Sequence, residues 1–245
     1  IAEHCCRNLG SRLLLVGTGQ SALTGTTSLA RLQARFTIKA SLSDADVQSV
    51  IRKTVLQKKP ERIPDIQKVI ADNQGEISRH LHNTRLAANA GDEVYYASDY
   101  PLLPVRRRFW EKVLRSVDAS GTTAQLRTQL KIVFDTARDT APKPLGCVVP
   151  ADSIYDEISS DLLNTGILQR EYHETIMGLR DGSPAGHLKS RLCALMFLIS
   201  HLPRSAGADD GVRATADSLA DLLVEDLRQD GSRLRQEAPR LLDEL

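Results

Sequence analysis

Apolar residues recur every three or four positions from residue 63 almost to the C-terminus, and no other feature restricts the fold of this chain as strongly. Ile63, Ile66, Val69 and Ile70 begin the pattern. This spacing places the apolar side chains on one face of an α-helix. Glycines and prolines interrupt the pattern at intervals that suit short connections between helices. We therefore expect a mainly α protein.

A segment near the N-terminus departs from the helical pattern. Residues 12–16 form a short apolar run that stops at Gly17-Thr18-Gly19-Gln20, as a buried parallel strand ends in a polar loop. Residues 36–40 alternate apolar with polar or small residues, which is typical of a second strand. A helix start of the S-x-x-D type follows at residues 43–46. The fold class we expect is thus mainly α with a small α/β remnant at the N-terminus.

Charge and composition exclude several classes of protein. The 245 residues contain 32 Lys and Arg against 31 Asp and Glu, so the net charge of +1 creates no global field toward nucleic acid or a membrane. The longest apolar run, residues 193–199, is far shorter than the roughly 20 residues of a membrane-spanning helix. Four cysteines without a C-x-x-C pair favour a reducing cytoplasm over a disulfide framework.

Proline-rich breaks divide the helical region. Pro101 and Pro104 follow a polar cluster, and Pro142, Pro144 and Pro150 mark a second break. The stretch after residue 204 holds ten Asp or Glu against five Arg. We expect five segments: residues 1–42, 43–92, 93–141, 142–204 and 205–245.

Four stretches resemble a known family. They are GTGQSAL at residues 17–23, LARLQARF at 29–36, YPLLPVRRRFW at 100–110 and ATADSLADLL at 214–223. They resemble the large P-loop ATPases of bacteriophage-exclusion (BREX) systems, the BrxC/PglY family. The order of strand, polar loop, short helix, strand and helical subdomain also looks like the second half of an AAA+ ATPase module.

The resemblance implies a role for each of the five segments. The first would be the C-terminal half of an AAA+ core and the second its helical lid. The third and fourth would be winged-helix-like helical modules, and the fifth an acidic helical end. Neighbouring ATPase subunits would be the main partners in a cytoplasmic oligomer, with DNA and other defence proteins as further partners.

The same resemblance implies roles for individual residues. Thr18 or Gln20 matches the sensor-1 position, and Arg35 matches the arginine finger, with Arg31 one turn earlier. A guanidinium suits a finger because it is permanently charged and forked. Arg79 is nearest to sensor 2, although it lies one residue outside the usual Gly-x-x-Arg spacing. Without the resemblance, the interpretation of Arg35 is an ordinary cation at a helix end, where the helix dipole favours positive charge.

Two motifs of an ATPase are missing from the chain. The sequence holds no G-x-x-x-x-G-K-[ST], and no apolar strand ends in the acidic pair of a Walker B box. We expect the nucleotide core to lie upstream of Ile1 and this chain not to hydrolyse ATP alone. ATP and Mg²⁺ would belong to the parent protein. The alternative is a non-enzymatic helical adaptor or DNA-binding module with no nucleotide role.

A basic triplet raises the question of nucleic-acid binding. Arg106, Arg107 and Arg108 precede Phe109-Trp110, and Arg127 lies in the next helix. Such residues are typical of the phosphate-contacting surface of a winged-helix module. The alternative is a solvated helix start whose aromatic side chains belong to the core. Either interpretation places the arginines on a surface.

The histidines are not spaced as the metal ligands of known zinc motifs are. His80 and His82 are two residues apart and face different sides of a helix, and the stretch at residues 171–174 lacks the second histidine of HExxH. We predict no metal site.

Overall fold

The computed structural model describes residues 16, 38, 44–117 and 124–245, and it describes the side chains of all of these except residues 44–46 and 124–127. The chain divides into two units, residues 1–41 and 42–245. In the first unit only Val16 and Ile38 are described; both are exposed and lie outside helix and strand. The strands predicted around them otherwise fall outside the described residues.

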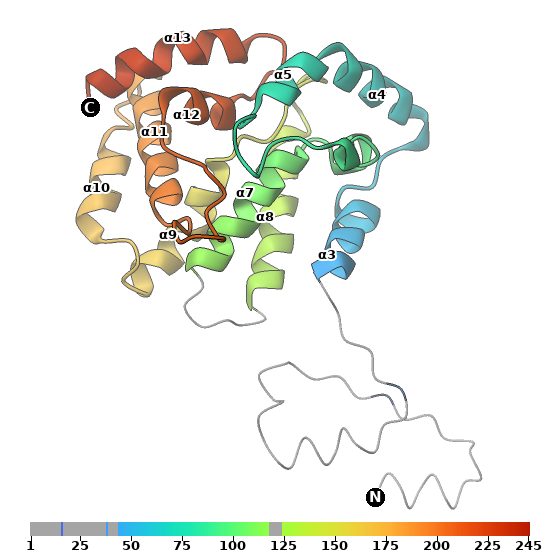
Figure 1. Ribbon diagram of the computed structural model, residues 1–245, viewed down its shortest axis with the longest axis horizontal. Helices are drawn as coiled ribbons and strands as arrows, with labels where there is room; N and C mark the ends of the chain where they lie inside the picture. The colour runs from blue at the N-terminus through green and yellow to red at the C-terminus, as the bar shows by residue number, and fades with distance from the viewer. Residues whose placement is uncertain (1–15, 17–37, 39–43, 118–123) are drawn as a thin grey trace, which may run out of the picture. The chain divides into compact units, whose positions relative to one another are not determined.

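The described part of the second unit is mainly α-helical, which confirms the predicted fold class at this level (Figure 1). Its α-helices are α3 (Asp44–Val50), α4 (Ile63–Asp72), α5 (Gln74–Arg79), α6 (Tyr96–Asp99), α7 (Pro104–Val117), α8 (Ala124–Thr140), α9 (Ser153–Asn164), α10 (Arg170–Gly178), α11 (Pro184–Ser200), α12 (Ala216–Leu223) and α13 (Asp230–Asp243). A π-helical turn, η2 (Ile51–Val55), and two 3₁₀ turns, η3 (Pro60–Arg62) and η4 (Ala90–Asp92), complete the helical elements of these residues. Among these helices, none is both long and apolar enough to cross a membrane.

One hydrophobic core runs through this unit from Val47 to Leu241. Helix α7 contributes its predicted apolar face: Phe109, Trp110 and Val113 are all buried. Burial of such side chains removes large apolar areas from water and is the main source of stability for the helices.

The C-terminal helices pack on one another. Helix α13 lies against both α11 and α12, and α10 lies against α11 (Figure 1). Side-chain caps define where two of these helices begin. Ser183 accepts a hydrogen bond from the backbone N–H of Gly186 ahead of α11, and Thr215 accepts one from Ser218 ahead of α12. The sequence pattern did not indicate α10.

The region after α5 differs from the expectation. The apolar spacing predicts that the helix resumes through Leu81 and Leu86 to Gly91, but α5 ends at Arg79. Leu81 has a φ of 54°, in the left-handed region that a helix cannot use. Its N–H donates to the Asp221 carboxylate at 3.0 Å instead of to a carbonyl one turn earlier. A distant side chain therefore ends this helix.

The segment predicted as a break at residues 142–150 is exposed in its first half and buried in its second. Gly146, Cys147, Val148 and Val149 are buried. The backbone N–H of Val148 donates to the carbonyl of Glu225 at 2.7 Å, and other backbone bonds join this segment to residues 222–227. Within the described residues, β pairing is limited to two isolated bridges here. We call residues 145–151 the central strap.

Candidate functional site

The residues that the resemblance assigns to nucleotide chemistry are mostly outside the described part. Thr18, Gln20 and Arg35 lie there. Arg79 is the last residue of α5 and its side chain is exposed. Its carbonyl accepts a hydrogen bond from the His82 backbone N–H at 3.1 Å, and its guanidinium has no ion pair within residues 44–117 and 124–245.

Arg106 is a correction to the surface position that the basic triplet predicted. Its side chain is completely buried in the core. One Nη donates to the carbonyl of Val149 in the central strap, and the other lies 3.5 Å from the carbonyl of Asp221 in α12. Burial lowers the pKa of Arg106 to about 10, so the guanidinium stays charged at neutral pH. In this position Arg106 has no exposed surface that a phosphate could contact.

Arg107 and Arg108 are also engaged with the protein. Arg107 is 9% exposed and lies 3.4 Å from the Asp99 carboxylate. Arg108 forms a forked pair with Asp92 at 2.7 and 2.9 Å and donates to the carbonyls of Leu86 and Ala87. Such two-pronged pairs fix a side chain in one orientation. The two arginines thus anchor the segment between α5 and α7.

Arg127, the fourth residue of the nucleic-acid prediction, lies in α8. Its side chain is outside the described part of the chain. Binding of nucleic acid therefore stays a prediction.

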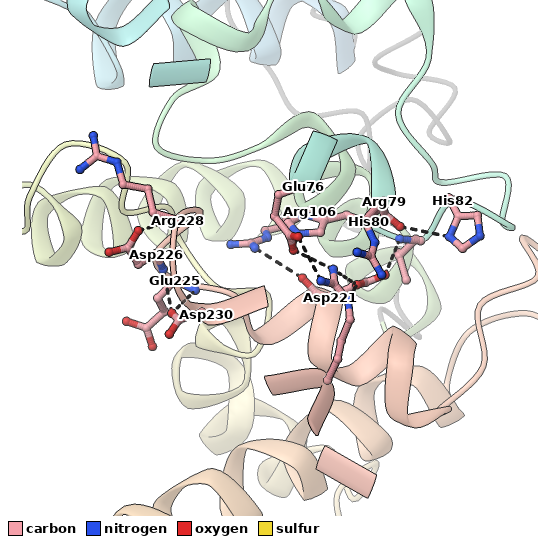
Figure 2. A network of polar contacts seen from close by, with 12 residues as sticks. Glu76, Arg79, His80, His82, Arg106, Asp221, Glu225, Asp226, Arg228 and Asp230 are labelled. Atoms are coloured by element: carbon pink, nitrogen blue, oxygen red, sulfur yellow. Dashed lines mark hydrogen bonds and ion pairs between the residues drawn. The ribbon is translucent and has the colours of Figure 1, made fainter. Parts of the chain in front are cut away.

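The most concentrated group of buried charges comprises Glu76, His80, Arg106, Asp221 and Arg235, which we call the ionic cluster. Figure 2 shows Glu76 of α5 and His80, which directly follows that helix, close to Arg106 of α7 and Asp221 of α12. Arg235 of α13 connects two of them: its Nη2 lies 2.7 Å from Glu76 and 2.7 Å from Asp221. The cluster therefore joins α5, α7, α12 and α13.

A glycine makes room for this arrangement. Gly231 lies one helical turn before Arg235 on α13, so both face the same neighbour. A Cβ at position 231 would lie 2.5 Å from Cδ of Glu76. Only glycine lets the carboxylate approach α13 closely enough to pair with Arg235.

The charge states within the ionic cluster follow from its geometry. Burial alone would raise the pKa of Glu76, but hydrogen bonds from His80 and Arg235 outweigh it and lower the pKa to about 2. Burial lowers the pKa of His80, so the imidazole is neutral at pH 7. Its Nε2 lies 3.2 Å from Glu76, and because a carboxylate only accepts, Nε2 carries the proton. Nδ1 is then a buried acceptor without a partner.

The ionic cluster is built for joining helices. Its carboxylates are paired, it holds no Ser, Thr or Cys nucleophile, and its residues do not line either of the two cavities described next. A second group at Glu225, Asp226, Arg228 and Asp230 lies apart from it in Figure 2. There Asp230 accepts the backbone N–H groups of Glu225 and Asp226 and holds the start of α13.

Two cavities in the described part of this unit are candidate ligand sites. The first, about 490 Å³, lies between the start of α11, residues 223–225 and α13. Its most buried cation, Arg191, is already paired with Asp152 at 2.6 Å and Glu225 at 2.7 Å. The second, about 360 Å³, lies between α4, the end of α8 and the loops around Lys58 and Tyr100. Within the described ranges, no group of three or more side chains is arranged to hold a metal ion.

Comparison with known proteins gives no family for this chain. No family model matches it. No solved structure matches it either.

Proposed function

We propose that this chain is the C-terminal part of an AAA+ type P-loop ATPase of the BREX BrxC/PglY family, acting in anti-phage defence in the cytoplasm. Residues 1–42 would supply Arg35 to a neighbouring subunit's γ-phosphate, with Thr18 or Gln20 as sensor 1 and Arg79 as sensor 2. The helical unit from residue 43 would serve as lid and docking region, with winged-helix-like modules among its helices. ATP and Mg²⁺ would be held by the rest of the parent protein.

One observation carries the helical part of this proposal. Two of the stretches that resemble the family, residues 100–110 and 214–223, contact each other in the core. Arg106 of the first reaches the carbonyl of Asp221 in the second, 115 residues later. Stretches that are far apart in sequence and meet in one buried joint are expected where the resemblance reflects a shared fold.

The burial of two arginines of the basic triplet favours proteins over DNA as the first binding partners of the helical unit. Arg106 and Arg107 are buried and Arg108 is paired with Asp92, so the basic triplet offers little accessible charge to a phosphate backbone. We therefore propose neighbouring ATPase subunits and other defence proteins as the first partners, and DNA as a further partner through residues such as Arg127.

The test begins with the gene. Codons upstream of Ile1 that encode an in-frame G-x-x-x-x-G-K-[ST] are expected, because an AAA+ core places its P-loop ahead of the sensor-1 strand. A start codon immediately before Ile1 would overturn the proposal of an ATPase and favour a non-enzymatic helical adaptor.

Arg35 then provides the biochemical test in the longer protein. Arg35→Ala should lower ATP turnover by about 10³- to 10⁵-fold while nucleotide binding is retained, as for loss of an arginine finger. Arg31→Ala, one turn earlier, is the matched control and should leave most of the turnover. Equal turnover in the two variants would exclude Arg35 as a finger.

A further inference from the structure

Lys58 lies in the loop between η2 and η3 with no anionic partner at its ammonium. Its Nζ donates to the carbonyl oxygens of Leu56 and Ser98, the latter at 3.0 Å. The nearby carboxylate of Asp99 is already held by Arg52 at 2.5 Å and by Arg107 at 3.4 Å. Within the described residues Lys58 forms no ion pair. A half-buried ammonium is thus left with capacity for one further acceptor.

Lys58 is one of the residues that line the cavity of about 360 Å³. Most of the wall is apolar, and it is formed by Ile66, Tyr100, Pro101, Ala137, Ala141 and Leu145. Lys58, Thr140 and Lys143 supply the polar groups. A mostly apolar cavity of this volume with a few polar groups in its lining is a common form of small-molecule site.

We propose that this cavity binds a small carboxylic acid with an apolar body, whose carboxylate pairs with Lys58. The apolar wall takes the body of the ligand out of water, and the ammonium supplies a charge-assisted hydrogen bond. This site does not depend on the proposed ATPase role.

The charges around the cavity favour binding of a singly charged carboxylate over a doubly charged phosphate. Lys143 is neutralised by Glu225 at 2.7 Å, which leaves Lys58 as the unpaired cation of the lining. Helix α8 ends at Thr140, so its carbonyl end, with partial negative charge, borders the cavity. A dianionic group would meet one free cation and this unfavourable helix end.

The affinity of the site should depend on pH through Lys58. Burial lowers the pKa of Lys58 to about 8, with Asp99 opposing the shift. The ammonium is charged at pH 7 and becomes neutral as the pH rises, so carboxylate binding weakens above about pH 8. Burial raises the pKa of Tyr100, which stays neutral in this range. The charge that acts on Lys58 is Asp99, which is itself paired with Arg52 and Arg107. Lys143, the other charged residue of the lining, is paired with Glu225.

Calorimetry with three carboxylates tests the proposal: benzoate, cyclohexanecarboxylate and octanoate. At least one should bind with a stoichiometry near one, and its uncharged amide should bind about tenfold more weakly or worse, as for a lost charge-assisted hydrogen bond. Phenyl phosphate should bind more weakly than benzoate. Failure of all three carboxylates to bind would overturn the proposal.

Variants locate the binding. Lys58→Gln should weaken carboxylate binding about tenfold, whereas Lys59→Gln, at the adjacent exposed residue, should not change it. Ala141→Phe, at an exposed position of the cavity wall, should block binding without altering the far-UV circular dichroism. Equal affinity in the wild-type and Lys58→Gln proteins, or binding that persists in Ala141→Phe, would show that the ligand binds elsewhere.

Discussion

Replacing Asp221 by alanine removes an acceptor that the backbone N–H of Leu81 shares with two N–H groups of Arg235. Its carboxylate accepts from the backbone N–H of Leu81 at 3.0 Å and from Nε and Nη2 of Arg235 at 3.2 and 2.7 Å. Its side chain is only 7% exposed, so water replaces few of these bonds. The substitution therefore leaves a buried N–H unpaired and deprives the partly buried guanidinium of Arg235 of one partner.

The magnitude follows from these losses. Charge-assisted bonds contribute about 1.5–3 kcal/mol, and an orphaned buried N–H costs about 1–3 kcal/mol. Breaking a buried ion pair by removing one partner costs about 3–5 kcal/mol, and here Arg235 keeps Glu76. We expect Asp221→Ala to lower the free energy of unfolding by about 4 kcal/mol. Asp221→Asn, which retains one acceptor oxygen, should cost about half as much.

Urea unfolding measures this loss. Trp110, the single tryptophan of the chain, is buried and donates to the carbonyl of Ala151, so its fluorescence reports the core. With a urea dependence of about 2–3 kcal/mol per molar, the midpoint should fall by about 1.3–2 M. Asp217→Ala, an exposed residue in the first turn of the same helix, should cost less than about 1 kcal/mol. Equal losses for Asp221→Ala and Asp217→Ala would refute the reasoning.

Two further predictions concern other residues of the ionic cluster. Burial lowers the pKa of His80 in the folded state below its value of about 6.5 in the unfolded chain. As the pH falls below about 6.5, His80 therefore takes up a proton in the unfolded chain first, and the free energy of unfolding decreases. Urea unfolding at about pH 7 and pH 5 should show this loss, and a variant His80→Gln with an undiminished pH slope would contradict it. Gly231→Ala pushes against the Glu76 carboxylate and should destabilise by about 1–3 kcal/mol in thermal unfolding. Gly178→Ala, where a Cβ meets open space, should be neutral or stabilising by up to about 1 kcal/mol, and a similar loss in both glycine variants would count against the packing explanation.

The helical fold class could be predicted because helical periodicity is local. Phe109, Trp110 and Val113 follow the three- and four-residue spacing, and the structure buries them as that spacing predicts. The same spacing contained a signal about Arg106, which lies three residues before Phe109 and four before Trp110. It therefore shares their buried face. The charge of Arg106 favoured a surface position. That prediction was wrong because the carbonyl groups that accept from Arg106 lie in the central strap and in α12, far away in the sequence.

The end of α5 could not be predicted for a related reason. Ile77, Leu81 and Leu86 fit a continuing helix, and no glycine or proline interrupts residues 76–90. The chain turns at Leu81 because Asp221, 140 residues away in sequence, accepts its N–H. Likewise, the prolines at residues 142–150 indicate an interruption of helix, which is correct, but they cannot show that residues 146–149 are buried. The free ammonium of Lys58 depends on which carbonyls and carboxylates surround it, and one sequence does not contain that information.

The burial of Arg106 has a consequence for biosynthesis. At a translation rate of about 5–20 residues per second, Asp221 emerges about 6–23 s after Arg106, since the two are 115 residues apart. During this interval α7 can form and Arg106 can reach the carbonyl of Val149, but its second acceptor in α12 is still missing and the core around α7 is incomplete. The core around α7 is therefore completed only after α12 has been made, and folding of this unit is expected late in its synthesis.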